Sequence, residues 1–131
     1  MNPTNGASKP PAQALLTNEE MMNNTQATLL AARTLISKKK YWTQHRVATD
    51  KHDVGVSIEH PEACKFCAIG ALSFVYEGKG DFPTRAHSFL QKAIEELGGQ
   101  HGESVAMFND RASHKKVMKM FDRAIELAGD E

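Results

Sequence analysis

The sequence has few cysteines and no excess charge of either sign. Its two cysteines, Cys64 and Cys67, stand three residues apart, whereas extracellular disulfide frameworks use more cysteines at wider spacing. The 16 Lys and Arg residues balance 16 Asp and Glu residues. Proteins that bind nucleic acid through its phosphates usually carry a basic excess, so this balance argues against nucleic acid as a partner.

Long apolar runs are also absent. No stretch approaches the roughly 20 apolar residues that a membrane span requires. The first residues, "MNPTNGASKPPAQALL", lack the basic start and apolar block of a signal peptide. We therefore expect a cytoplasmic protein with no membrane partner. Residues 1–16 are rich in Pro, Asn, Gly and Ala, which predicts a flexible tail ahead of a single domain over residues 17–131.

Apolar spacing in the rest of the chain predicts a mainly α-helical domain. We expect a compact bundle of about four helices around one central apolar helix. A capping box at Thr17 and Glu20 begins the first helix, Asp81 and Pro83 begin the third, and Ser113 caps the last. The last helix carries a clear apolar stripe: Val117, Phe121, Ala124, Ile125 and Ala128.

The central helix is predicted from the stretch "EACKFCAIGALSFVY". Pro61 suits its first position and Gly78 its end. The chain has two long connections, one before this helix and one between the third helix and the last. Residues 41–61 lack helical periodicity, and the alternation of Val54, Val56 and Ile58 favours a small β-hairpin within residues 47–58. Residues 100–113 are predicted to be a loop that places Val105 and Phe108 in the core. Long structured loops are often functional.

The C-x-x-C pair has three interpretations. If Cys64 and Cys67 share a helix face, they could bind zinc together with His60 and His52, as in a structural zinc domain. Alternatively, Cys67 could be the nucleophile of a small hydrolase or transferase, with Asp110 and a histidine such as His87 or His114. The favoured interpretation is core packing, because free cysteine behaves as a small apolar side chain. We therefore expect no cofactor, with zinc as the alternative.

Four polar or aromatic residues stand out in the two connections. Trp42 and Gln44 occur in "YWTQ", and Asn109 and Asp110 occur in "MFNDRAS". A tryptophan N–H usually finds a hydrogen-bond acceptor, and Asn and Asp often bond to the backbone of turns.

These motifs resemble those of a family of small uncharacterised proteins from bacteria and their phages. The resemblance is carried by "TLLAARTLISKKKYWTQ", "PEACKFCAIGAL", "MFND" and "VMKMFDRAIELA", and covers about residues 25–128. The motifs W-x-Q, C-x-x-G-A-L and aromatic-N-D fall on Trp42, Gln44, Cys67, Gly70, Ala71, Leu72, Asn109 and Asp110. Phe108 stands where Trp is common, and His60 where a small capping residue is usual. The resemblance implies no activity.

Together the motifs suggest a single site where both connections meet one end of the central helix. Such a site would be either a polar latch or a small ligand pocket, formed by Trp42, Gln44, Cys67, Gly70, Asn109 and Asp110. The leading functional hypothesis is a non-enzymatic, phage- or prophage-related binding or interaction protein. Its partner would be a protein or a small ligand.

Overall fold

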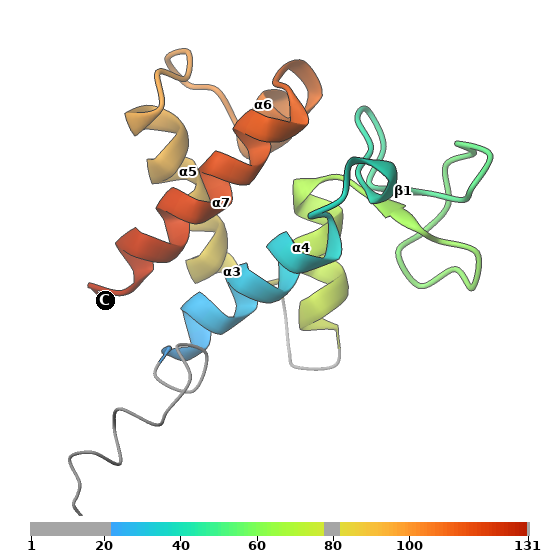
Figure 1. Cartoon of the computed structure of the whole chain (residues 1–131), viewed down its shortest axis with the longest axis horizontal. Helices are drawn as coiled ribbons and strands as arrows, with labels where there is room; N and C mark the ends of the chain where they lie inside the picture. Colours follow the sequence, from blue (N-terminus) through green and yellow to red (C-terminus); the bar gives the residue numbers. More distant parts are fainter. Residues whose placement is uncertain (1–21, 78–81, 131) are drawn as a thin grey trace, which may run out of the picture.

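The computed structural model describes residues 22–77 and 82–130, and most of them lie in helices (Figure 1). The described elements are α3 (Asn24–Leu35), η1 (Lys39–Tyr41), β1 (Ala48–Thr49), β2 (Lys65–Phe66), α4 (Ala68–Tyr76), α5 (Thr84–Glu96), α6 (Val105–Arg111) and α7 (His114–Ala128). The predicted fold class is confirmed. The predicted tail, the cap at Thr17, Gly78 and Asp81 lie outside the described residues.

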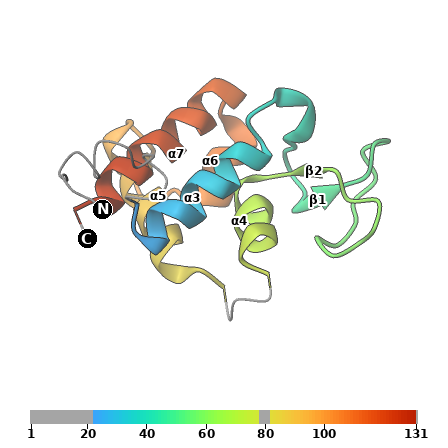
Figure 2. The same cartoon turned by 60° about the horizontal axis from the view of Figure 1, so that its bottom comes forward.

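The core lies among α3, α4, α5 and α7. Helix α3 packs against α4 on one side and α7 on the other, and α7 also packs against α5. The largest buried side chains include Leu29, Leu72, Leu90 and Phe121, one from each of these helices. The segment between η1 and α4 extends from one end of the bundle, where it carries the two short strands (Figure 2).

Helix caps explain where several helices begin. Ser113 caps α7 as predicted, since its Oγ accepts a hydrogen bond from Lys116 N at 3.2 Å. Asn23 caps α3 in a reciprocal capping box with Gln26. Each cap satisfies a backbone N–H that has no partner inside its own helix. Within the two described ranges, no helix combines the length and apolar character needed to cross a membrane.

The central helix is shorter than the sequence predicted. It begins at Ala68, and Cys67 is its N-cap residue, so Pro61 and Cys64 lie outside the helix. The reason is backbone pairing with β1: Cys64 N donates to Thr49 O at 2.9 Å, and Cys67 N donates to Val47 O at 3.2 Å. These long-range hydrogen bonds draw the residues before Ala68 into an extended conformation and override their local helical preference.

The predicted hairpin region contains β1 and a tight reversal. Asp50 N donates to Val54 O, and Val56 N donates to Ala48 O, each at 3.0 Å. The strand that pairs with β1 is β2, in antiparallel register with Ala48 opposite Phe66. The small sheet therefore joins residues 47–58 to the start of α4.

The predicted loop over residues 100–113 contains helix α6. Ser104 caps it, with Oγ accepting from Met107 N at 3.1 Å. Val105 and Phe108 are buried, as predicted, and Asn109 is buried beside them. Spacings of three and four place these side chains on one helix face. The polar Asn109 interrupts what would otherwise read as an apolar stripe.

Candidate functional site

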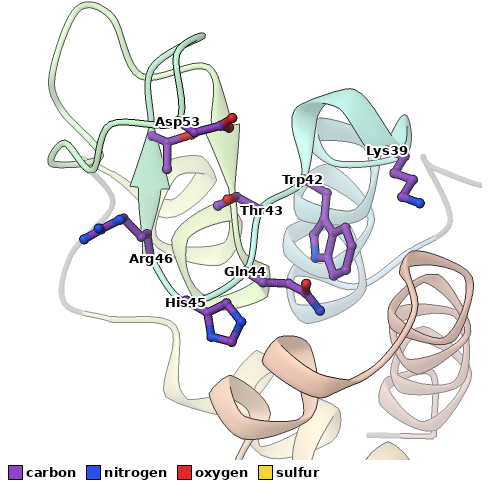
Figure 3. A pocket seen from close by; sticks show the side chains of 8 residues that line it. Lys39, Trp42, Thr43, Gln44, His45, Arg46 and Asp53 are labelled. Atoms are coloured by element: carbon purple, nitrogen blue, oxygen red, sulfur yellow. The ribbon is translucent and has the colours of Figure 1, made fainter.

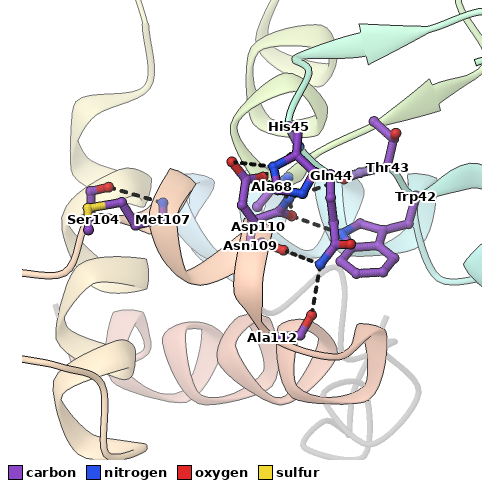
Figure 4. A network of polar contacts seen from close by, with 10 residues as sticks. All are labelled: Trp42, Thr43, Gln44, His45, Ala68, Ser104, Met107, Asn109, Asp110 and Ala112. Carbon is purple, nitrogen blue, oxygen red and sulfur yellow. Dashed lines mark hydrogen bonds and ion pairs between the residues drawn. The ribbon is translucent and has the colours of Figure 1, made fainter.

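Asn109 is the centre of the polar contacts between the two connections. Its side chain is fully buried, and its Oδ1 accepts hydrogen bonds from Trp42 Nε1 at 2.8 Å and Ala68 N at 3.0 Å (Figure 4). Its Nδ2 donates to Thr43 O at 3.1 Å and Asp110 Oδ1 at 3.2 Å. The amide therefore makes all four of its hydrogen bonds within the protein. Because Ala68 is the first residue of α4, Asn109 also satisfies an N-terminal N–H of that helix.

Three further hydrogen bonds join the same segments. Gln44 Nε2 donates to Asn109 O and to Ala112 O, each at 3.1 Å. Asp110 Oδ1 accepts from His45 N at 2.7 Å, and His45 has a φ of 69°, in the left-handed region that non-glycine residues seldom adopt. We call these contacts the Trp42–Asn109 network; its members are Trp42, Gln44, His45, Ala68, Asn109 and Asp110 (Figure 4).

Cys67 and Gly70 lie beneath this network at the start of α4. Cys67 is 5% exposed, and its Sγ accepts from Gly70 N at 3.3 Å. A Cβ on Gly70 would lie 2.0 Å from Val47 O, so only glycine allows this close approach of α4 to the connection. The structure thus brings Trp42, Gln44, Cys67, Gly70, Asn109 and Asp110 to one end of α4.

Burial raises the pKa of the Cys67 thiol. Hydrogen bonds from Gly70 and Ile69 oppose this effect but do not outweigh it, and Asp110 raises the pKa further. A thiol held in its neutral form is a poor nucleophile. His45 Nδ1 lies 3.7 Å from Asp110 Oδ2.

Neither of the two histidines suggested as a base contacts Asp110. His87 packs against Phe82, and the Nε2 of His114 lies 2.7 Å from Ile36 O. These contacts therefore link neither His87 nor His114 to Asp110; the histidine beside this carboxylate is His45.

The four residues of the alternative zinc site are not brought together. Cys64 and Cys67 do not share a helix face, because only the residues after Cys67 are helical. His60 Nδ1 accepts from Glu62 N at 3.0 Å, and His52 is exposed. In residues 22–77 and 82–130, no group of three or more His, Cys, Asp or Glu side chains is placed to hold a metal ion.

A hollow of about 530 Å³ lies beside the network. All of its lining residues come from the connection between α3 and β2: Lys39, Trp42, Thr43, Gln44, His45, Arg46, Thr49 and Asp53 (Figure 3). We call it the Trp42 hollow. Its volume is within the range of small-molecule sites. The sequence predicted only Trp42 and Gln44 of this lining, although the unusual length of the connection pointed to this region. The residues that it missed are Lys39, Thr43, His45, Arg46, Thr49 and Asp53.

Comparison with protein families matches residues 21–127 to a family of unknown function, DUF6197. This chain belongs to that family. No curated protein and no solved structure matches it. The matched range is close to that of the motifs compared above, so the Trp42–Asn109 network and the hollow of this DUF6197 member both lie inside the family region.

A second hollow, of about 430 Å³, is lined by residues of α3, η1, β2 and α4 of this DUF6197 member and of the segments that adjoin them. It is lined mainly by apolar side chains, with Cys64 among them: Thr34, Leu35, Ser37, Lys38, Tyr41, Ala63, Cys64, Phe66 and Phe74. Cys64 is half-buried and free. Cys64 therefore lines this hollow together with Tyr41, Phe66 and Phe74, and it is not a member of the Trp42–Asn109 network.

Proposed function

We propose that this DUF6197 member is a non-enzymatic binding protein that takes a small ligand in the Trp42 hollow. The observation that carries the proposal is the state of Thr49, which lines the hollow. This residue is 1% exposed, and its hydroxyl has no hydrogen-bond partner among the described residues. A buried hydroxyl without a partner costs roughly 1–3 kcal/mol. A ligand that bonds to it would remove that cost.

The neighbouring network supports binding by holding one wall of the hollow in place. Trp42 and Gln44 line the hollow, and each is fixed by a hydrogen bond to Asn109. A site whose walls are already ordered loses less conformational entropy when it binds. The network side chains already bond to backbone groups and to one another, so their role in this proposal is to position the wall.

Binding is favoured over catalysis by the surroundings of Cys67. The thiol is buried, its pKa is raised, and its sulfur accepts a hydrogen bond from the helix that it caps. It is also absent from the lining of the Trp42 hollow. A hydrolase or transferase would need this thiol exposed to substrate and ionised.

We further propose a cytoplasmic location and a phage- or prophage-related role. The two free thiols suit a reducing compartment. The relation to phages is supported by the likeness of the motifs at Trp42, Cys67 and Asn109 to those of small bacterial and phage proteins.

Trp42, the only tryptophan, provides a direct test. A panel of anionic, neutral and cationic small molecules is added to the full chain while tryptophan emission and backbone amide NMR shifts are recorded. We expect at least one class to change the emission and to shift amides of residues 39–53, while α5 amides stay unchanged. A panel in which no compound affects residues 39–53 would refute a small-ligand role for this hollow.

A further inference from the structure

The second hollow is the more apolar of the two, and it lies where η1, β2 and α4 meet the end of α3, which packs against α4 (Figure 1). We call it, with the lining residues given above, the Phe74 hollow. At about 430 Å³, it is roughly three times the size of an apolar cavity of about 150 Å³ that binds benzene. Lys38 is the only charged residue in its lining, and no lining residue is acidic. The hollow therefore has room for a small organic molecule, and the one charge in its lining is positive.

Three aromatic side chains line the Phe74 hollow. Phe66 of β2 and Phe74 of α4 contact each other, with ring centroids 5.0 Å apart, and Tyr41 is the last residue of η1. Phe66 is 3% exposed, whereas Phe74 and Tyr41 are 38% and 40% exposed. The lining thus includes both buried and open ring surface. Contacts between aromatic rings are more stable than their buried area alone accounts for, so this lining favours a ligand that is itself aromatic.

The positive charge of Lys38 belongs to the same turn as one of these aromatic residues. Tyr41 N donates to Lys38 O at 2.9 Å, which closes the turn of η1. Lys38 is exposed, and it has no ion pair with any described residue. A lysine can line an apolar hollow with its methylene groups while its ammonium stays in water at the edge. One unpaired cation at an apolar hollow complements a ligand that carries a single negative charge.

The two aliphatic hydroxyl groups in the lining already have acceptors for their protons. Thr34 Oγ1 donates to Leu30 O at 2.8 Å, and Ser37 Oγ donates to Thr34 O at 2.9 Å. A hydroxyl has one proton to donate, so neither group can donate to a ligand while these hydrogen bonds last. The attraction of a charged ligand to this hollow therefore depends mainly on Lys38.

We infer that the Phe74 hollow binds a small aromatic carboxylate. The ring system of the ligand packs against Tyr41, Phe66 and Phe74, and its carboxylate lies at the edge of the hollow, where the flexible Lys38 side chain can reach it. A carboxylate carries one negative charge, which one lysine can neutralise, whereas a phosphate monoester carries a charge of about −1.5 to −2. The inference does not rest on the Trp42 hollow, because the two hollows share no lining residue.

The test uses Cys64 to report whether the hollow is occupied. Cys64 is half-buried and lines the Phe74 hollow, whereas Cys67 is 5% exposed and lines neither hollow. Alkylation of Cys64 by iodoacetamide in the full chain is followed by mass spectrometry in the presence of benzoate, 2-naphthoate or indole-3-acetate. The three corresponding amides lack the charge, and octanoate lacks the ring.

We expect at least one of the three acids to bind in the Phe74 hollow. At about ten times its Kd, that acid should slow alkylation of Cys64 by about ten-fold. It should also shift the backbone amide NMR signals of residues 63–66 and 74. Its affinity should exceed that of its amide and that of octanoate by about three-fold or more. Added salt should reduce the difference between acid and amide.

Variants with matched controls assign the contacts. Lys38→Gln should abolish the preference for the acid over its amide, whereas Lys39→Gln should retain it, because Lys39 lines the Trp42 hollow instead. Phe74→Ala should weaken binding of both acid and amide by about ten-fold, equivalent to about 1.4 kcal/mol. Phe82→Ala removes a similarly exposed phenylalanine, at 43%, from outside this hollow and should leave binding unchanged. Thermal unfolding of each variant shows that the fold is retained.

The inference is wrong if none of the three acids slows alkylation of Cys64 or shifts residues 63–66 and 74. It is also wrong if the amides or octanoate bind as tightly as every acid, because the charge or the ring would then contribute nothing. An acid that shifts residues 43–53 but leaves Cys64 alkylation unchanged binds in the Trp42 hollow, and this too would overturn the inference. Alkylation that slows with rising protein concentration, without ligand, would show that a second copy of the chain covers the hollow instead. If Cys64 of the free protein reacts too slowly to follow, the amide shifts of residues 63–66 and 74 decide alone.

Discussion

Replacing Asn109 with alanine should strongly destabilise the protein. The change leaves three groups without their partner: Trp42 Nε1–H, Ala68 N–H and Thr43 C=O. The Ala68 N–H lies in buried surroundings, and an orphaned buried group costs about 1–3 kcal/mol. The other two are partly buried, so we assign about 1 kcal/mol to each. We expect the free energy of unfolding to fall by about 3–5 kcal/mol, a large share of the roughly 5–15 kcal/mol of a typical domain.

The assay is urea unfolding, followed both by Trp42 fluorescence and by circular dichroism of the helices. Asn24→Ala is the matched control, because Asn24 is exposed at the start of α3, and this variant should stay within about 0.5 kcal/mol of the parent. A loss below about 1 kcal/mol for Asn109→Ala, with an unchanged urea dependence, would refute the argument that the network holds the two connections together.

Three more predictions follow from single contacts. Glu103 is almost fully buried, and its pKa is lowered because the Arg111 guanidinium donates hydrogen bonds to it. The pKa of Glu103 is lower in the folded state than in the unfolded state. The stabilisation from this pair is therefore present above about pH 4.3, and it is lost as the pH falls further and the carboxylate is protonated. Glu103→Gln should therefore lower the free energy of unfolding by about 1–3 kcal/mol at pH 7. It should also make that free energy, measured by urea unfolding, depend less on pH at acid pH. Gly70→Ala should lower the thermal midpoint severely or prevent folding, because its Cβ would lie 2.0 Å from Val47 O. Cys67 should resist iodoacetamide in the folded protein and react in urea, as read by mass spectrometry.

Matched controls accompany these three measurements. Glu95→Gln, on the exposed face of α5, should leave the acid profile unchanged. Gly98→Ala meets no atom within 4 Å but has a φ of 81°, so it should cost only about 1 kcal/mol. If Glu103→Gln left the acid side of the stability profile unchanged, the stabilising role of the Arg111 pair would be refuted. A thermal midpoint of Gly70→Ala equal to that of the parent would refute the close approach of α4 to Val47. Alkylation of Cys67 in the folded protein at the rate seen in urea would refute its burial.

Local sequence was sufficient to predict the helical class and several helix features. Ser113 caps α7, and the apolar stripe of α7 is buried apart from the partly buried Ile125, because both features depend on residues within a few turns of one another. Four members of the Trp42–Asn109 network, Trp42, Gln44, Asn109 and Asp110, were also predicted to meet at one end of the central helix, whereas His45 and Ala68 were not. The residue types indicated this, because a tryptophan N–H and an asparagine amide require hydrogen-bond partners when they are buried.

Only the tertiary structure decided where α4 begins, that α6 exists, and which residues form the hollow. Lys65 and Phe66 leave the predicted helix because a strand distant in the sequence supplies their backbone partners. Lys39 and Arg46 look like ordinary surface residues in the sequence. Whether their positive charges are neutralised depends on which carboxylates lie nearby in the folded protein. Hydrogen-bond and charge partners come from chain segments far apart, so no local pattern of residues can specify them.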